Sequence, residues 1–95
     1  MSALWIAHVT VTDDEAYGRY SQLATKAIAA HGGTFIARGG RFIQLEGHAR
    51  PRNVVVRFPS VEVAEECYKS EIYREALTHA SGASERELLI VEISE

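Results

Sequence analysis

The order in which strand-like and helix-like patterns of apolar residues follow one another constrains the fold of this chain most. Residues Leu4–Thr12 read LWIAHVTVT, which is rich in β-branched and aromatic residues and too short for a typical helix, so a strand is predicted there. Apolar residues then recur at helical spacing over residues 16–28. A Thr-x-x-Glu capping box at Thr12 and Glu15 predicts the start of this helix, and the pair Gly32-Gly33 predicts its end.

The middle of the chain has two interpretations. Residues 34–38 and 41–47 both resemble strands, and Gly39-Gly40 separates them. The glycine pair is compatible with a tight hairpin turn, or with a bulge that bends one long strand. We favour the bulge, because residues 48–52 already offer a turn containing Pro51 before the next predicted strand, over residues 53–58.

Two serines mark the predicted helix starts in the second half. Ser60 is the expected N-cap of a helix over residues 61–68, and Ser70 caps a second piece over residues 71–80. A loop over residues 81–84 and a strand over residues 87–93 follow. This order is typical of a ferredoxin-like α+β sandwich, in which the helices cover one face of a four-stranded antiparallel sheet. We expect one domain over residues 1–95, because this length leaves no room for a second core.

Alternation within each predicted strand indicates which side chains face the helices. We assign the wholly apolar phases to the core: Trp5, Ala7, Val9 and Val11; Phe35 and Ala37; Val54, Val56 and Phe58; Leu89, Val91 and Ile93. The opposite face mixes polar residues with six large aliphatic ones: Leu4, Ile6, Ile36, Val55, Leu88 and Ile90. Full burial of these six would contribute about 9–18 kcal/mol. Such a patch predicts a homodimer with the two sheets face to face; the alternative is a solvent-facing sheet with scattered hydrophobic residues.

Short motifs over nearly the whole chain carry a resemblance to a known family. They are Trp5-Ile6-Ala7-His8-Val9 with Asp13; Tyr17 and Tyr20; Gly32-Gly33-x-Phe35; Arg38-Gly39-Gly40; Glu46-Gly47; Phe58-Pro59-Ser60; Tyr68-x-Ser70-x-x-Tyr73; and Ile90-Val91-Glu92. In combination they resemble the small bacterial proteins grouped as domain of unknown function 1330. That family is similar to the dimeric α+β barrel superfamily, which includes cofactor-independent monooxygenases, muconolactone isomerases and haem-dependent relatives.

The resemblance implies a ferredoxin-like fold and a homodimer, and it implies no established activity. The chain departs from the family at one place. Members often carry an arginine in the region corresponding to residues 78–81, where this chain has His79 and Ala80. The resemblance therefore does not supply an anion site built on that arginine.

The distribution of charge suggests a small anionic ligand. The chain has 10 lysines and arginines against 13 aspartates and glutamates, a net charge of −3, which argues against coating nucleic acid by bulk charge. Residues 38–57 nevertheless hold five arginines against Glu46 alone, a local net charge of +4. Arginine forks suit carboxylates and phosphates. In the structural alternative, Arg50 and Arg52 belong to a solvated loop.

We predict a candidate ligand-binding set of six residues: His8, Tyr17, Tyr20, Arg38, Arg57 and Tyr68. Histidine is a possible base near neutral pH, and the tyrosines are expected to line a pocket between helices and sheet. In the structural alternative the histidine is hydrogen-bonded at an interface and the tyrosines pack on the sheet. The two arginines would then pair with Glu92 or Glu46 at the interface, because structural ion-pair networks resemble sites.

Two hypotheses of function from different classes remain. The first is a dimeric protein that binds a small anionic or aromatic metabolite, with a cofactor-independent oxygenase or isomerase as a fold-level analogy. The second is a non-catalytic dimeric interaction module whose polar sheet residues determine pairing.

Several kinds of site and partner are not expected. The single Cys67 has no disulfide partner, reads as a small buried hydrophobic residue, and suits a reducing, cytoplasmic location. The histidines show no ligand spacing, so neither a metal nor another cofactor is predicted. Nucleic acid is not an expected partner, because Trp5, Phe35 and Phe58 are assigned to the helix side rather than to an open stacking face. No leader or membrane-spanning run is recognised in the sequence.

Overall fold

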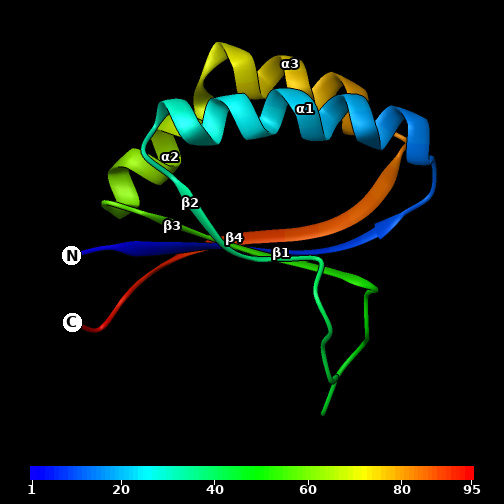
Figure 1. The fold of residues 1–95 in the computed structure, drawn as a ribbon, viewed down its shortest axis with the longest axis horizontal. Coiled ribbons are helices and arrows are strands. Elements are labelled where there is room, and N and C mark those ends of the chain that lie inside the picture. The colour runs from blue at the N-terminus through cyan, green and yellow to red at the C-terminus, as the bar shows by residue number, and fades with distance from the viewer.

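The computed structural model describes residues 1–95 as a four-stranded sheet with helices on one face. The elements in chain order are β1 (Ala3–Val11), α1 (Asp14–Ala30), β2 (Thr34–Arg38), β3 (Arg52–Phe58), α2 (Val61–Lys69), α3 (Glu71–Ala80) and β4 (Ser84–Glu92). The strands lie in the order β2-β3-β1-β4, and all neighbours are antiparallel. Figure 1 shows the helices on one side of the sheet and the segment between β2 and β3 extending from the other side. The predicted ferredoxin-like α+β sandwich is confirmed.

Side chains that accept hydrogen bonds from the first turn determine where each helix begins. Ser60 and Ser70 accept from the amides of Val63 and Tyr73, which confirms both predicted caps. The predicted cap at Thr12 is wrong. Asp13 caps α1 instead, because its Oδ1 accepts from the amide of Ala16 at 3.1 Å, whereas the hydroxyl of Thr12 donates to the carbonyl oxygen of Gly82 at 3.4 Å.

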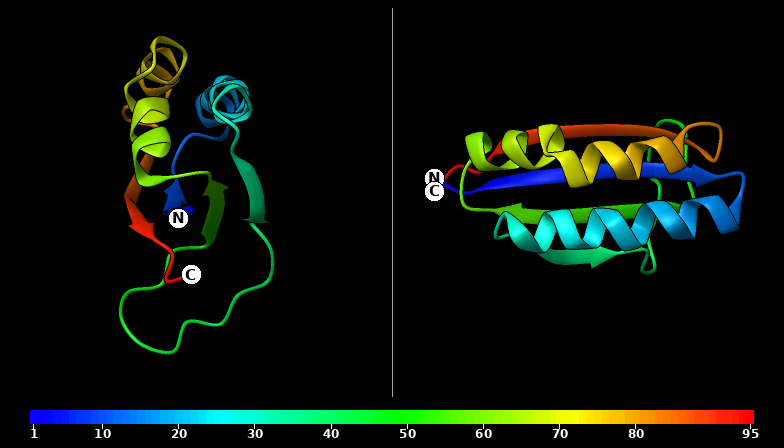
Figure 2. Two further views of the ribbon diagram at one scale, coloured as in Figure 1. Left: turned by 90° about the vertical axis from the view of Figure 1, so that its left-hand side faces the viewer. Right: turned by 90° about the horizontal axis from the view of Figure 1, so that it is seen from above.

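The segment after β2 is not the predicted strand. Residues 40–50 contain no strand, and Gly39, at φ +71°, begins the departure from the sheet. The amide of Gly39 still bonds to Asn53 of β3, but the following residues have no neighbouring strand. The left view in Figure 2 shows this segment as a long excursion from the sheet. Neither the hairpin turn nor the glycine bulge is therefore correct.

A bulge does occur, but earlier, within β2. Phe35 lies opposite Val56, whereas the next paired residues are Ala37, opposite Val55, and Arg38, opposite Val54. The extra residue shifts the alternation by one, so Arg38 joins the helix-covered face and Ala37 leaves it. Phe35 packs against the core as predicted. The assignment of Ala37 to the core is wrong.

The helix-covered face of β1 and β3 is as predicted, and that of β4 is reversed. Trp5, Val9, Val56 and Phe58 are at most 2% exposed. In β4 the core-packed residues are Leu88 and Ile90, whereas Leu89 and Val91 are 53% and 44% exposed. The register decides this, because antiparallel partners share a face and β1 places Ala7 and Trp5 opposite the two core-packed residues.

Cys67 is fully buried on α2, and burial raises the pKa of its thiol to about 11. Because the thiolate is the reactive form, we expect Cys67 in the folded protein to be essentially unreactive toward iodoacetamide at pH 8. Mass spectrometry of the native protein would show unmodified chain after an hour, and the same treatment in guanidinium chloride would give complete modification. Rapid labelling of the native protein would contradict the burial of this thiol.

None of the three helices is both long and apolar enough to cross a membrane.

Candidate functional site

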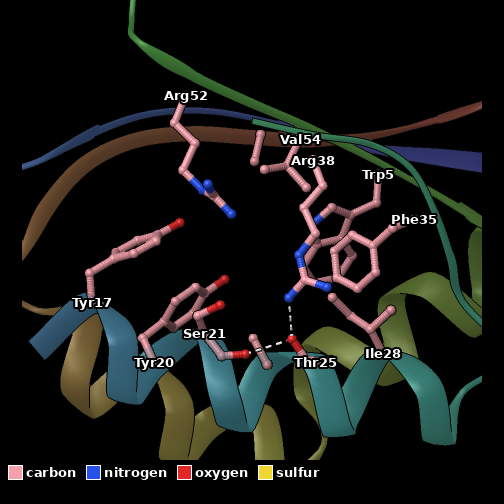
Figure 3. A pocket seen from close by; sticks show the side chains of 12 residues that line it. Trp5, Tyr17, Tyr20, Ser21, Thr25, Ile28, Phe35, Arg38, Arg52 and Val54 are labelled. Carbon is pink, nitrogen blue, oxygen red and sulfur yellow. Dashed lines mark hydrogen bonds between the residues drawn. The ribbon is translucent and has the colours of Figure 1, made fainter. Parts of the chain in front are cut away.

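A pocket lies between α1 and the helix-covered face of the sheet (Figure 3). Its lining comes from α1 and from three strands: Tyr17, Tyr20, Ser21, Ala24, Thr25 and Ile28; Trp5 and Ala7; Phe35 and Arg38; Arg52 and Val54. The empty space including the mouth is about 360 Å³, of which about 30 Å³ is wide enough for the centre of a water molecule. The pocket is thus narrow in this conformation, with apolar walls and two arginines.

Arg38 is held across the pocket by α1. Its guanidinium donates to Thr25 Oγ1 at 2.6 Å and lies 4.0 Å from the centre of the Phe35 ring. Thr25 in turn donates to the carbonyl oxygen of Ser21 at 2.7 Å, as the dashed lines in Figure 3 show. Since Arg38 bonds only to a neutral hydroxyl and stacks on an aromatic ring, its charge faces no counter-ion.

Arg52 enters the pocket from the start of β3, on the side of Tyr17 and Tyr20 (Figure 3). Its Nε is buried and has no hydrogen-bond partner, and its guanidinium carbon lies 6.0 Å from the centre of the Tyr17 ring. Gly39 leaves room for this side chain, because a Cβ at that position would come within 2.6 Å of Arg52 Nη1. A buried N–H without a partner is uncommon in native structures, so this donor is available for a ligand.

Tyrosines form a hydrogen-bonded cluster behind the pocket. The hydroxyls of Tyr20 and Tyr73 share a bond of 2.6 Å, and Arg86 donates to Tyr73 at 2.9 Å while lying over the Tyr20 ring at 4.7 Å. Burial raises the pKa of Tyr73, and it also raises the pKa of Tyr17, where the nearby Tyr20 adds to the effect. The two hydroxyls therefore stay protonated at neutral pH, and Tyr17 can donate a hydrogen bond into the pocket.

Three of the six predicted ligand-binding residues line this pocket, namely Tyr17, Tyr20 and Arg38. Tyr68 does not, since it borders a groove on the other side of Trp5, between α2 and β4. His8 and Arg57 lie on the opposite face of the sheet, where His8 Nδ1 donates to Asn53 Oδ1 at 2.6 Å. The structure thus brings together half of the predicted set.

Within one chain, neither Arg38 nor Arg57 pairs with Glu92 or Glu46. Arg57 pairs with Glu95 at 2.8 Å, and Arg38 has no carboxylate partner. Arg50 is not a solvated loop residue, because it bonds to Glu87 at 2.8 Å and to Thr10 at 3.0 Å on the open face of the sheet. The hydrogen bond from Arg50 lowers the pKa of the Glu87 carboxyl.

One residue that lines the pocket and one that supports the tyrosine cluster behind it are absent from the set predicted from the sequence. Arg52 was assigned to a loop, although its position two residues before Val54 already placed it on the helix-covered face of β3. Arg86, which supports the tyrosine cluster, lies on the same face of β4 as Leu88 and Ile90. Alternation along β3 is the signal that places Arg52 on the helix-covered face. The same signal does not place Arg86, because alternation does not show which face of β4 the helices cover.

No group of three or more histidine, cysteine, aspartate or glutamate side chains lies close enough to hold a metal ion.

The antiparallel sheet, its single layer of helices and the pocket beneath α1 define a ferredoxin-like α+β protein. The chain belongs to the family described as Domain of unknown function (DUF1330), whose sequence profile matches residues 2–94. The resemblance inferred from the sequence motifs is therefore confirmed. No curated protein matches the chain by sequence.

Solved structures share this fold at low sequence identity. RPA0582 from Rhodopseudomonas palustris, a protein of unknown function, is 19% identical with a TM-score of 0.82, covering 99% of this chain and 83% of that one. A dimeric ferredoxin-like protein of unknown function from Jannaschia sp. CCS1 is 11% identical with a TM-score of 0.72, covering 98% and 100% of the two chains. SnoaB, a cofactor-independent oxygenase from Streptomyces nogalater, is 8% identical with a TM-score of 0.61, covering 99% and 94%.

Proposed function

We propose that this protein binds a small carboxylate with an apolar or aromatic body in the pocket between α1 and the sheet. The buried, unpartnered Nε of Arg52 carries the proposal. An unmet buried donor costs about 1–3 kcal/mol, and a carboxylate oxygen at this place would remove that cost. A carboxylate also matches the planar fork of the guanidinium.

The electrostatics of the pocket support an anion. Arg38 and Arg52 both line it, no aspartate or glutamate does, and neither arginine forms an ion pair elsewhere. Two cations that share a partly buried space without a counter-ion repel each other, and a bound anion relieves this repulsion. Tyr17 adds a neutral hydroxyl donor.

The walls indicate the rest of the ligand. Trp5, Phe35 and Val54 give the pocket apolar walls. Because little of the pocket is wide enough even for water, a ligand enters only when Arg38 releases Thr25. This release is easy, because the hydrogen bond lies at the exposed mouth and a hydroxyl binds the guanidinium less strongly than a carboxylate does.

Isothermal titration calorimetry with benzoate and with hexanoate tests this proposal. We expect both to bind the native protein, and Arg52→Gln to weaken binding by about 10- to 100-fold, since a hydrogen bond to a charged group contributes about 1.5–3 kcal/mol. Arg74→Gln is the matched control, because Arg74 is exposed on α3 and does not line the pocket. Equal affinities for the native and Arg52→Gln proteins, or no binding at millimolar concentrations, would overturn the proposal.

We further propose that two copies associate through the open face of the sheet. Leu89 and Val91 are exposed there beside Ile6 and Leu4 of β1. The segment after β2, which extends from this side of the sheet in Figure 1, adds three exposed apolar side chains, Phe42, Ile43 and Leu45. Several exposed apolar side chains on one side of a molecule are typical of an interface. The dimeric neighbour from Jannaschia supports a second copy as the partner.

A cofactor-independent oxygenase or isomerase activity stays a prediction, because a shared fold does not carry an activity. A cytoplasmic location and the lack of a nucleic-acid partner also stay predictions.

A further inference from the structure

A second hollow adjoins the pocket at its mouth. It is lined only by polar residues, namely Ser21, Gln22, Thr25, Lys26 and Arg38. Ser21, Thr25 and Arg38 line both spaces, so Arg38 is the side chain between them. The two spaces therefore form an inner and an outer subsite along the same face of α1.

The outer subsite is cationic in the same way as the inner one. Its lining contains no aspartate or glutamate, and neither Lys26 nor Arg38 forms an ion pair. Ser21 and Thr25 supply hydroxyls next to these charges, one helical turn apart. Positive charge beside hydroxyl groups, with no acid to neutralise it, suits a second anionic group.

The subsites differ in width. About 410 Å³ of the outer subsite is wide enough for the centre of a water molecule, against about 30 Å³ of the inner one. A flat carboxylate suits the narrow inner subsite beside Arg52. The outer subsite is open to solvent, so the second anionic group stays partly hydrated there.

From this arrangement we infer that the natural ligand is a dianion. Its inner carboxylate binds at Arg52, its apolar body lies against the apolar walls of the pocket, and its outer anionic group binds at Lys26 and Arg38. This inference rests on the proposed binding function and narrows the ligand to dicarboxylates and related two-headed anions. It also assigns Lys26 as the residue that distinguishes ligands with two anionic groups from ligands with one.

The test compares ligands that differ only in the outer charge. Terephthalate is compared with 4-methylbenzoate, and the flexible adipate with hexanoate, by calorimetry on the full chain at low salt. We expect each dianion to bind about fivefold more tightly than its partner, as one exposed ion pair allows. Half-molar salt should remove most of this preference, because ions screen charges at the exposed outer subsite.

Lys26→Gln provides the decisive variant, because Lys26 is exposed and its replacement leaves the core intact. It should remove most of the preference for dianions, bringing the affinity for adipate close to that for hexanoate measured on the same variant. Lys69→Gln is the matched control, since Lys69 is the other lysine of the chain and lies on α2, outside both subsites.

The outcomes separate this inference from the binding proposal. If monoanions bind through Arg52 but dianions bind no better, or if the preference survives Lys26→Gln, the dianion inference is wrong and the binding proposal stands. If neither monoanions nor dianions bind, both are wrong.

Discussion

Replacing Trp5 by alanine is expected to lower the free energy of unfolding by about 3–5 kcal/mol. Trp5 is 2% exposed, and its ring contacts Tyr73 edge-on at 5.2 Å and Phe58 at 5.6 Å between centres. Removing a buried ring of this size costs about 3–5 kcal/mol through lost burial and the cavity left behind. A domain of 95 residues has a total stability of about 5–10 kcal/mol. The substitution therefore removes a large part of the free energy of unfolding.

Urea denaturation followed by far-ultraviolet circular dichroism measures this effect, since the variant lacks the chain's one tryptophan as a fluorescent probe. Ile72→Ala serves as the control, because Ile72 is a large apolar residue that is 41% exposed on α3. Its unfolding free energy should change by less than about 1 kcal/mol. An equally small change for Trp5→Ala would show that this ring is not at the centre of the core.

Leu89→Asp is expected to convert the proposed homodimer into a folded monomer. In an isolated chain Leu89 is 53% exposed beside Ile6, so a carboxylate there leaves the fold intact. In a sheet-to-sheet dimer the same carboxylate would be buried against apolar side chains without a partner. The two-fold symmetry would place it twice in the interface. We expect the dissociation constant of the dimer to increase by at least about 100-fold, because an unpaired buried charge costs several kcal/mol.

Sedimentation equilibrium over a range of concentrations measures this dissociation. Ile72→Asp is a matched control that places the same charge on an exposed apolar position of the helix layer, and it should leave the dimer unchanged. Circular dichroism of Leu89→Asp should match the native spectrum. A native protein that sediments as a monomer at about 1 mM, a concentration at which even weak dimers form, would overturn the proposed dimer. So would a Leu89→Asp protein that stays dimeric.

The two proposals concern opposite faces of one sheet. The helix-covered face carries the pocket with Arg38 and Arg52, and the open face carries the apolar residues of the proposed interface. Losing the dimer through Leu89→Asp should therefore leave benzoate binding intact, whereas Arg52→Gln should leave the dimer intact. If Leu89→Asp weakened benzoate binding, or if Arg52→Gln weakened the dimer, the partner copy would have to influence the pocket.

Local physical chemistry let the sequence alone determine most of the fold. Ser60 and Ser70 begin helices because a hydroxyl at that place satisfies the free amides of the first turn, whatever the rest of the chain does. In β1 and β3, polar residues such as His8 and Arg57 interrupt one phase of the alternation and so reveal the other as the core.

Contacts between distant segments decided the rest. Residues 88–91 of β4 are all apolar, so alternation did not distinguish its faces, and only the register against β1 set them. The bulge in β2 depends on pairing with β3, and it brings Arg38 under α1. The pocket needs that shift together with the unpartnered Arg52, and the shift arises from how β2 aligns with β3. Caps and periodicity are properties of neighbouring residues, whereas strand register is a property of the whole sheet, so the site was visible only in the tertiary structure.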